Sequence, residues 1–124
     1  MESSLNILSA LFKLLDAENF GIEGFIGNAP NNVQGEHYTL NCLSNPNEYL
    51  QVGYINLNIY LPEVKSGRAN LARFKELIDL FIPVIEDTSY GNYYFQIDDD
   101  KGIFKDQDHE KMYFYNLKLI FQTL

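Results

Sequence analysis

Strict alternation of aliphatic residues with polar and aromatic ones over residues 51–61 restricts the fold of this chain more than any other feature. Successive side chains of a β-strand point to opposite faces of the sheet, so a period of two predicts a strand. One face carries Ile55, Leu57, Ile59 and Leu61, and the other carries Tyr54, Asn56, Asn58 and Tyr60. We therefore expect one face to pack on a core and the other to meet solvent or a partner.

Apolar residues recur at helical spacing before and after this strand. One helix is predicted over residues 4–17 and a second over 69–86, where Pro83 would kink or shorten the last turn. The glycine-rich segment 21–35 carries turn residues and is expected to be a loop, with room for one short strand at 25–26. Three further strands are predicted over 37–43, 92–97 and 111–123.

These elements predict an α+β fold in the order α-β-β-α-β-β. The one-sided apolar pattern favours an antiparallel sheet of four or more strands with two helices packed on one face. The chain length of 124 residues suits one domain, so residues 1–124 are expected to share a single core. The predicted core consists of Leu8, Leu11, Leu15, Ile55, Leu57, Ile59, Phe74, Leu77, Ile78, Phe81, Leu117 and Leu119.

The composition also bounds where the protein works and what it binds. The sequence contains neither a basic segment followed by an apolar stretch nor a long uncharged apolar run, so we expect no signal peptide, no transmembrane segment and no membrane partner. Cys42 is the only cysteine, which excludes an intrachain disulfide and fits the reducing cytoplasm. A net charge of −8 repels phosphate backbones and disfavours sequence-independent binding to nucleic acid, and we expect no specific nucleic-acid binding.

Aromatic residues are unusually frequent, with nine Tyr and nine Phe. Because an aromatic ring buries much area at low entropic cost, some of these rings are expected at an interface. The last predicted strand adds apolar groups to the side that faces away from the core. The predicted interface residues are Tyr54, Asn56, Asn58, Tyr60, Phe114 and Ile120.

An acidic stretch over 98–110 is predicted to be a surface loop, with Asp98, Asp99, Asp100, Asp106 and Asp108 exposed to solvent. The spacing does not fit an EF-hand, which needs glycine at its sixth position and glutamate at its twelfth. Ile103 and His109 stand there when the count begins at Asp98. We therefore expect no metal and no cofactor at this loop.

No pattern of catalytic residues is visible elsewhere. His37 and His109 lie far apart in the sequence and outside any metal-ligand spacing, although His109 and Glu110 could form an acid–base pair. Cys42 has no basic neighbour in its strand and is expected to be a buried thiol, not a nucleophile. The chain is therefore predicted not to be an enzyme.

Taken together, these features resemble the tail-completion or tail-terminator proteins of long-tailed bacteriophages and prophages. The resemblance extends over about the whole chain, except for segment 21–35, which matches no feature of that family. It rests on the leading helix with Leu8, Leu11 and Leu15, the strand Gly53-Tyr54-Ile55-Asn56-Leu57-Asn58-Ile59-Tyr60-Leu61-Pro62, the helix start from Gly67 to Phe74, and the last strand Tyr115-Asn116-Leu117-Lys118-Leu119-Ile120-Phe121.

The resemblance implies a structural protein that forms a ring, usually a hexamer, at the head-proximal end of the tail tube. Such a ring stops tube growth and docks to the head, so the implied partners are other copies of the chain, tail-tube proteins and head-joining proteins. The implied location is the bacterial host cytoplasm during assembly and then the virion tail.

Two other interpretations of the function remain open. In the first, a monomeric binding module holds a protein or peptide on the face from Tyr54 to Tyr60 or at a sheet edge. In the second, a small hydrolase or metal protein uses its acidic side chains together with one histidine. The residues of that site would be Asp98, Asp100, Asp106, Asp108 and His109.

Overall fold

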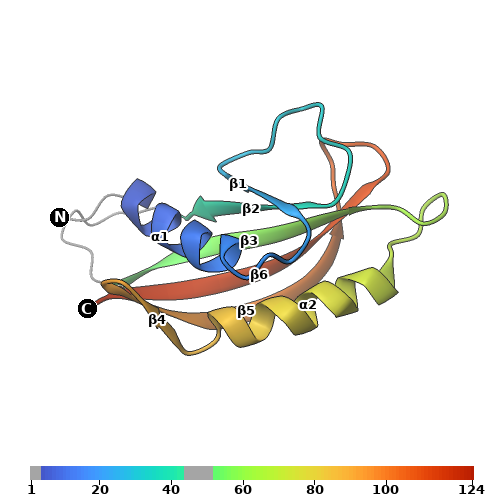
Figure 1. Cartoon of the computed structure of the whole chain (residues 1–124). Helices are drawn as coiled ribbons and strands as arrows, with labels where there is room; N and C mark the ends of the chain where they lie inside the picture. The colour runs from blue at the N-terminus through green and yellow to red at the C-terminus, as the bar shows by residue number, and fades with distance from the viewer. Residues whose placement is uncertain (1–3, 44–51) are drawn as a thin grey trace.

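The computed structural model describes residues 4–43 and 52–124. It contains two helices and one curled six-stranded sheet with strand order β1-β2-β3-β6-β5-β4 (Figure 1). Gln51, at the start of the predicted alternating strand, lies outside the described residues. The elements are α1 (Ser4–Asp16), β1 (Glu23–Ile26), β2 (His37–Cys42), β3 (Val52–Pro62), α2 (Leu71–Ile85), β4 (Thr88–Tyr90), β5 (Tyr93–Lys105) and β6 (Met112–Thr123).

The chain therefore has the mixed α+β class expected, but the strand order differs from the prediction. The order is α-β-β-β-α-β-β-β, because β1 and β4 add a short strand at each edge of the sheet. The sheet is mixed and not antiparallel, since β1 runs parallel to β2. Strands of four and three residues are too short to display a period, which is why β1 was expected at most as a fragment and β4 not at all.

Glycine at position 24 allows β1 to approach β2. A methyl group on Gly24 would collide with the ring of Tyr38, the residue directly opposite on β2. Tyr38 is buried in the core, so its ring has little freedom to move aside. The parallel pairing of β1 and β2 thus depends on a residue that has no side chain.

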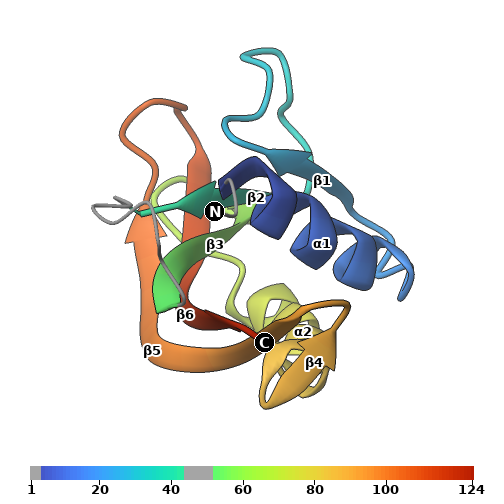
Figure 2. The same ribbon diagram turned by 90° about the vertical axis from the view of Figure 1, so that its left-hand side faces the viewer.

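The core lies between the two helices and the face of the sheet that we call the inner face. Every residue of the predicted core is buried in one continuous cluster. The two helices cover different parts of this face: α1 lies over β1 and β2, whereas α2 lies over β5 (Figures 1 and 2). Leu61, on the strand face that was expected to pack on the core, is buried as well. Buried residues that were not predicted include Ile7, Tyr38, Leu40, Tyr93 and Phe95.

Strand β5 is about twice as long as expected and contains more than half of the predicted acidic loop, residues 98–105. Asp98, Asp99 and Asp100 belong to this strand, and only Asp106 and Asp108 lie in the turn that follows it. The register of β5 on β6 shifts between Ile97 and Asp99 and again between Asp100 and Gly102. These irregularities break the period of two, so the sequence of this segment does not display the pattern of a strand.

Helix α2 begins where an asparagine caps its first turn. The Asn70 side-chain oxygen accepts a hydrogen bond from the Arg73 backbone N–H at 3.2 Å. The helix continues through Pro83 to Ile85. Within the described residues, neither helix is long and apolar enough to cross a membrane.

Candidate functional site

The face of the sheet that points away from the helices, which we call the outer face, carries all six predicted interface residues. The register of β3 on β6 places Tyr54 opposite Ile120 and Tyr60 opposite Phe114. Asn56 and Asn58, between the two tyrosines, lie opposite Lys118 and Asn116. Residues that are far apart in the sequence therefore form one continuous surface.

Five rings form a row across this face at the end of β3 that bears Tyr60. Phe25 of β1 meets His37 of β2 edge-on at 5.9 Å, and His37 stacks on Tyr60 of β3 at 4.7 Å. Tyr60 contacts Phe114 of β6 at 5.4 Å, and Phe114 stacks on Phe104 of β5 at 5.6 Å between ring centroids. We call Phe25, His37, Tyr60, Phe114 and Phe104 the aromatic row. It joins five neighbouring strands, and its outermost ring, Phe104, is 44% exposed.

Three members of the aromatic row were not predicted. Phe25 lies on a strand too short to show a pattern, and Phe104 lies beyond the two register shifts of β5. His37 begins β2, on the face opposite to Tyr38 and Leu40. Its position at the start of a predicted strand was the one sequence signal for its place in the row. Placing these rings requires the strand order of the sheet, which no local pattern contains.

Asparagine side chains occupy the middle of the outer face. The Asn116 amide donates to Asn58 Oδ1 at 2.6 Å and to Asn56 Oδ1 at 3.2 Å. Asn116 Oδ1 is buried and has no hydrogen-bond partner among the described residues. The cluster ties β3 to β6 through side chains as well as through the backbone, which makes this part of the face rigid.

The far end of the outer face, around Tyr54, combines an aromatic ring with charges. Lys118 Nζ lies 4.3 Å from the centre of the Tyr54 ring and 3.6 Å from Asp98 Oδ2. Tyr54 is 38% exposed, and Ile120 is partly buried beside it. This end is therefore an open amphipathic surface of the kind favoured at protein interfaces.

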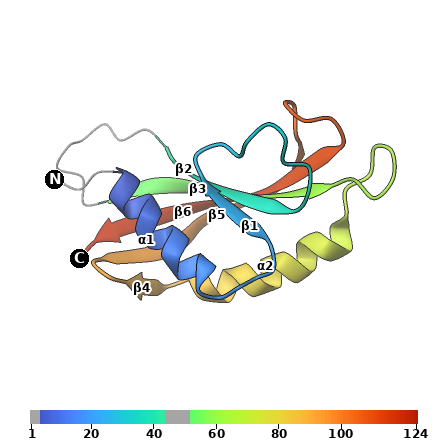
Figure 3. The same ribbon diagram turned by 45° about the horizontal axis from the view of Figure 1, so that its top comes forward.

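A polar pocket adjoins the aromatic row. Loops 27–36 and 106–111 rise on the same side of the molecule (Figures 1 and 3), and residues of both loops line this pocket of about 340 Å³ together with His37 and Tyr60. The pocket brings His37 and His109 to the same site, which their separation in the sequence did not indicate. Its lining residues are Asn28, Ala29, Asn31, His37, Thr39, Tyr60, Asp106, Asp108 and His109.

The buried acid of this pocket is Asp106. Its Oδ2 is 2.9 Å from His109 Nδ1, and its Oδ1 accepts the Asp108 backbone N–H at 3.0 Å. Asp106 is only 8% exposed, so it is not the solvated loop residue that was expected. The two hydrogen bonds offset the free-energy cost of removing the Asp106 carboxylate from water, which is why this residue can be buried.

The electrostatics of the pocket follow from burial. Desolvation lowers the pKa of His37 and raises the pKa of Tyr60. The Thr39 hydroxyl and the Asn58 side chain lie close enough to the Tyr60 phenol to oppose that rise, but burial outweighs them. His37 is therefore favoured in its neutral form and Tyr60 in its protonated form.

The remaining acidic residues do not join this site. Asp98 lies beside Lys118, and Asp100 accepts a hydrogen bond from the Tyr115 hydroxyl at 2.8 Å. Burial, with a smaller effect of Asp100, raises the pKa of Tyr115 to about 12. In the described part of the chain, no three His, Cys, Asp or Glu side chains are grouped so that they could hold a metal ion.

The Cys42 thiol is half-buried, and desolvation raises its pKa.

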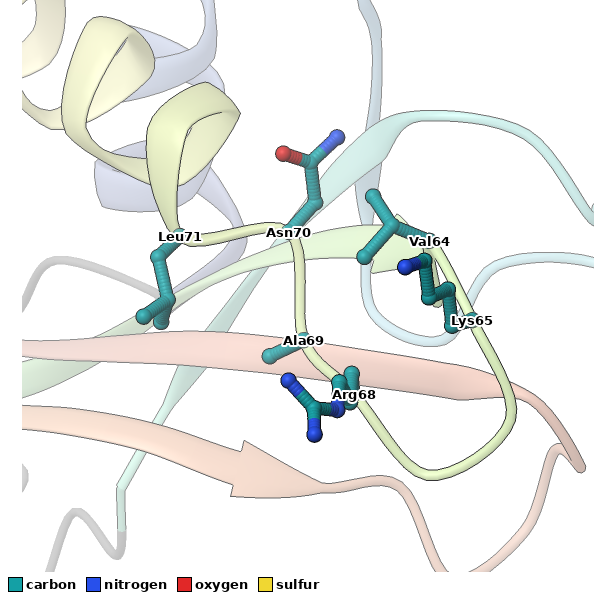
Figure 4. Close-up of a pocket in the computed structure, with 6 residues that line it drawn as sticks. All are labelled: Val64, Lys65, Arg68, Ala69, Asn70 and Leu71. Atoms are coloured by element: carbon teal, nitrogen blue, oxygen red, sulfur yellow. The ribbon is translucent and has the colours of Figure 1, made fainter.

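A second surface lies on the loop between β3 and α2, which extends beyond the sheet (Figure 1). Val64 N–H donates to the Arg68 carbonyl, and Gly67 adopts a positive φ of 76° at the tip. The loop bounds a hollow of about 600 Å³ that includes Lys65 and the exposed side chain of Leu71 (Figure 4). It thus presents cationic and apolar groups together on an otherwise acidic protein.

Comparison with known proteins supports the fold. No protein-family model and no curated protein matches the chain. A solved structure with 13% sequence identity aligns with it at a TM-score of 0.59, covering 100% of this chain and 97% of the other. At this identity the likeness concerns the fold alone, and the name of that protein carries no functional description.

Proposed function

We propose that this chain is a structural subunit that forms a ring with copies of itself, as tail-completion proteins do, and that the outer face of its sheet makes the contact. The aromatic row is the observation that carries the proposal. Rings from five strands lie next to one another there, and Phe104 at the end of the row remains exposed. Aromatic surfaces that remain open in a monomer favour burial against another protein.

A ring requires a heterologous contact, in which one surface meets a different surface on the next copy. The outer face supplies one candidate surface. The loop between β3 and α2, with exposed Val64 and Leu71, supplies the other. Repeated from copy to copy, such a contact would close a ring. The chain would then resemble tail-completion proteins in its assembly as well, and its further partners would be the tail tube and the head-joining proteins.

The sheet edges are less suited to binding a partner strand. β1 has four residues and β4 has three, so an added strand would gain few backbone hydrogen bonds along either of them. β4 pairs only with Tyr93, Tyr94 and Phe95, so the rest of β5 leaves a longer edge, but two register shifts interrupt this part of the strand. Irregularities of this kind hinder the pairing of an edge with another strand. This favours the outer face over the edges as the contact surface, whether the partner is another copy or a different protein.

Electron microscopy of negatively stained protein tests the proposal. The wild-type chain at high concentration and moderate salt should form rings, and it should cap purified tail tubes. Phe104→Ser should abolish both, whereas Leu80→Ser should not, because Leu80 has similar exposure, 48% against 44%, but lies on α2. The gene should also stand between genes for head-joining and tail-tube proteins.

Two outcomes contradict the proposal. If wild-type protein forms no rings and caps no tubes, and if phage genes are absent from its locus, the outer face serves a monomeric binding module instead. If both serine variants assemble like the wild type, the contact surface is not the aromatic row.

A further inference from the structure

The polar pocket contains a buried hydroxyl group without a partner. Thr39 is 3% exposed and lines the pocket. Although the Tyr60 phenol is close, Thr39 Oγ1 makes no hydrogen bond of normal geometry among the described residues. Because an unmade hydrogen bond of a buried hydroxyl is costly, this atom indicates that a polar group completes the site.

Three other groups of the pocket are hydrogen-bond acceptors. His37 Nδ1 lies 2.8 Å from the Gly35 carbonyl, which can only accept, so Nδ1 carries the proton and Nε2 is left as the acceptor. The Asp108 carboxylate has no ion-pair partner in the described part of the chain. Asp106 brings a second carboxylate. A ligand that donates hydrogen bonds is complementary to these three groups.

Charge restricts the ligand further. Two carboxylates line the pocket, and the whole protein carries a net charge of −8, so an anion would be repelled. The enclosed volume of about 340 Å³ suits a side-chain-sized group. We propose that this pocket binds a cationic nitrogen donor, an alkylammonium or guanidinium group, through Thr39, Asp108 and His37.

This chemistry has two possible sources. One is a free amine or guanidine of low molecular weight. The other is Lys65 or Arg68 on the loop between β3 and α2 of another copy, which carries cations on an acidic protein. The first source is independent of self-assembly, so the pocket proposal can succeed or fail without the proposed function.

Nuclear magnetic resonance of the isotope-labelled full chain tests the pocket. Methylguanidinium and butylammonium chloride should shift the resonances of Thr39, His37 and Asp108, with dissociation constants on the order of millimolar for such small ligands. Tetramethylammonium is a cation that cannot donate a hydrogen bond, and it should leave these resonances unchanged. Sodium chloride at the same ionic strength is the control for salt. Inorganic phosphate tests whether the pocket binds an anion instead.

Two substitutions probe the binding groups. Asp108→Asn should weaken methylguanidinium binding on the order of tenfold, because one charge-assisted hydrogen bond is lost. Asp79→Asn on α2 changes the net charge equally and should leave the affinity unchanged. Thr39→Val preserves shape while removing the hydroxyl, and it should weaken binding severalfold in a protein whose spectrum remains folded.

A second arm distinguishes the two sources. A labelled chain with Lys65→Gln and Arg68→Gln receives either unlabelled wild-type chain or unlabelled chain with the same two changes. Shifts of Thr39 and Asp108 with wild type alone identify the loop of another copy as the source. If neither addition causes shifts and methylguanidinium does, the source is a free cation.

Four results would overturn the proposal. The pocket resonances would stay unchanged with every cation, or they would respond to tetramethylammonium as strongly as to methylguanidinium. Alternatively, phosphate would bind in place of the cations. Equal effects of Asp108→Asn and Asp79→Asn would show that binding reflects net charge and not this pocket.

Discussion

The imidazole of His37 and the phenol of Tyr60 lie face to face across β2 and β3, with ring centroids 4.7 Å apart and planes inclined by 3°. The two residues are also directly opposite in the strand register. His37 Nδ1–H donates a hydrogen bond to the Gly35 carbonyl of the preceding loop, whereas the Tyr60 ring contacts Phe114 within the aromatic row. This pair therefore joins the polar pocket to the proposed contact surface.

Acid should destabilise the protein partly through His37. Burial lowers the pKa of this histidine from its ordinary value of 6.5, so the unfolded chain binds the proton more readily than the folded one. The free energy of unfolding should therefore fall as the pH decreases from about 6.5 downward. The groups that act on His37 are Glu23, Asp106 and His109, and all three remain in the variant His37→Phe.

Urea unfolding of both proteins between about pH 5 and pH 8 measures this effect. His37→Phe retains a ring in the row, and its midpoint should decrease less on acidification than that of the wild type. Equal pH dependence in the two proteins would exclude His37 as the cause.

Replacing Gly24 should disrupt the parallel edge of the sheet. The added methyl group of Gly24→Ala would collide with the Tyr38 ring, and overpacking of this kind costs about 1–3 kcal/mol. Gly35→Ala is the matched control, because open space surrounds that position and its φ is not positive. It should be neutral or stabilising by about 0.4–1 kcal/mol. Thermal unfolding compares the two, and equal stability would mean that β1 does not lie against Tyr38.

Leu57 should be among the most sensitive positions of the core. It is fully buried in the middle of β3, and Leu57→Ala should cost about 2–5 kcal/mol of unfolding free energy. Leu80→Ala removes the same atoms from an exposed position and should change stability by no more than about 0.5 kcal/mol. An unchanged urea midpoint for Leu57→Ala would show that the strand faces the other way.

Divalent cations should bind weakly or not at all near residues 98–108. Asp98 and Asp100 lie in the middle of β5 and Asp106 follows its end, and each of the three has its own partner. Calorimetric titration with calcium and magnesium should therefore detect no binding tighter than about 10 µM, the range of sensor sites. Tighter binding would restore the metal-protein reading.

Much of the inner face could be predicted because the strands that form it are buried on one side only. The alternation of Ile55, Leu57 and Ile59 with polar residues indicated which side of β3 packs on the core. The helical spacing of Phe74 and Phe81 indicated which side of α2 is buried. Such patterns reflect burial against a core, so they survive without knowledge of the strand order.

The aromatic row and the polar pocket could be predicted only in part. Tyr60 and Phe114 were expected on the contact surface, but Phe104 lies past two register shifts that break the period. Asp106 resembles any acidic loop residue until the turn brings His109 against it. Contacts of this kind depend on how distant segments pair, and local spacing carries no information about that pairing.

Light scattering across salt and protein concentration measures whether the chain assembles through the aromatic row. With a net charge of −8 per copy, the wild-type chain should have the monomer mass of 14.3 kDa in dilute buffer of low salt. Its mass should rise at higher concentration and near physiological salt, where the Debye length falls to about 8 Å. Phe104→Ser should stay monomeric under those conditions, and Leu80→Ser should associate like the wild type. A wild-type chain that remains at the monomer mass throughout, or a Phe104→Ser variant that associates equally well, would contradict assembly through the aromatic row.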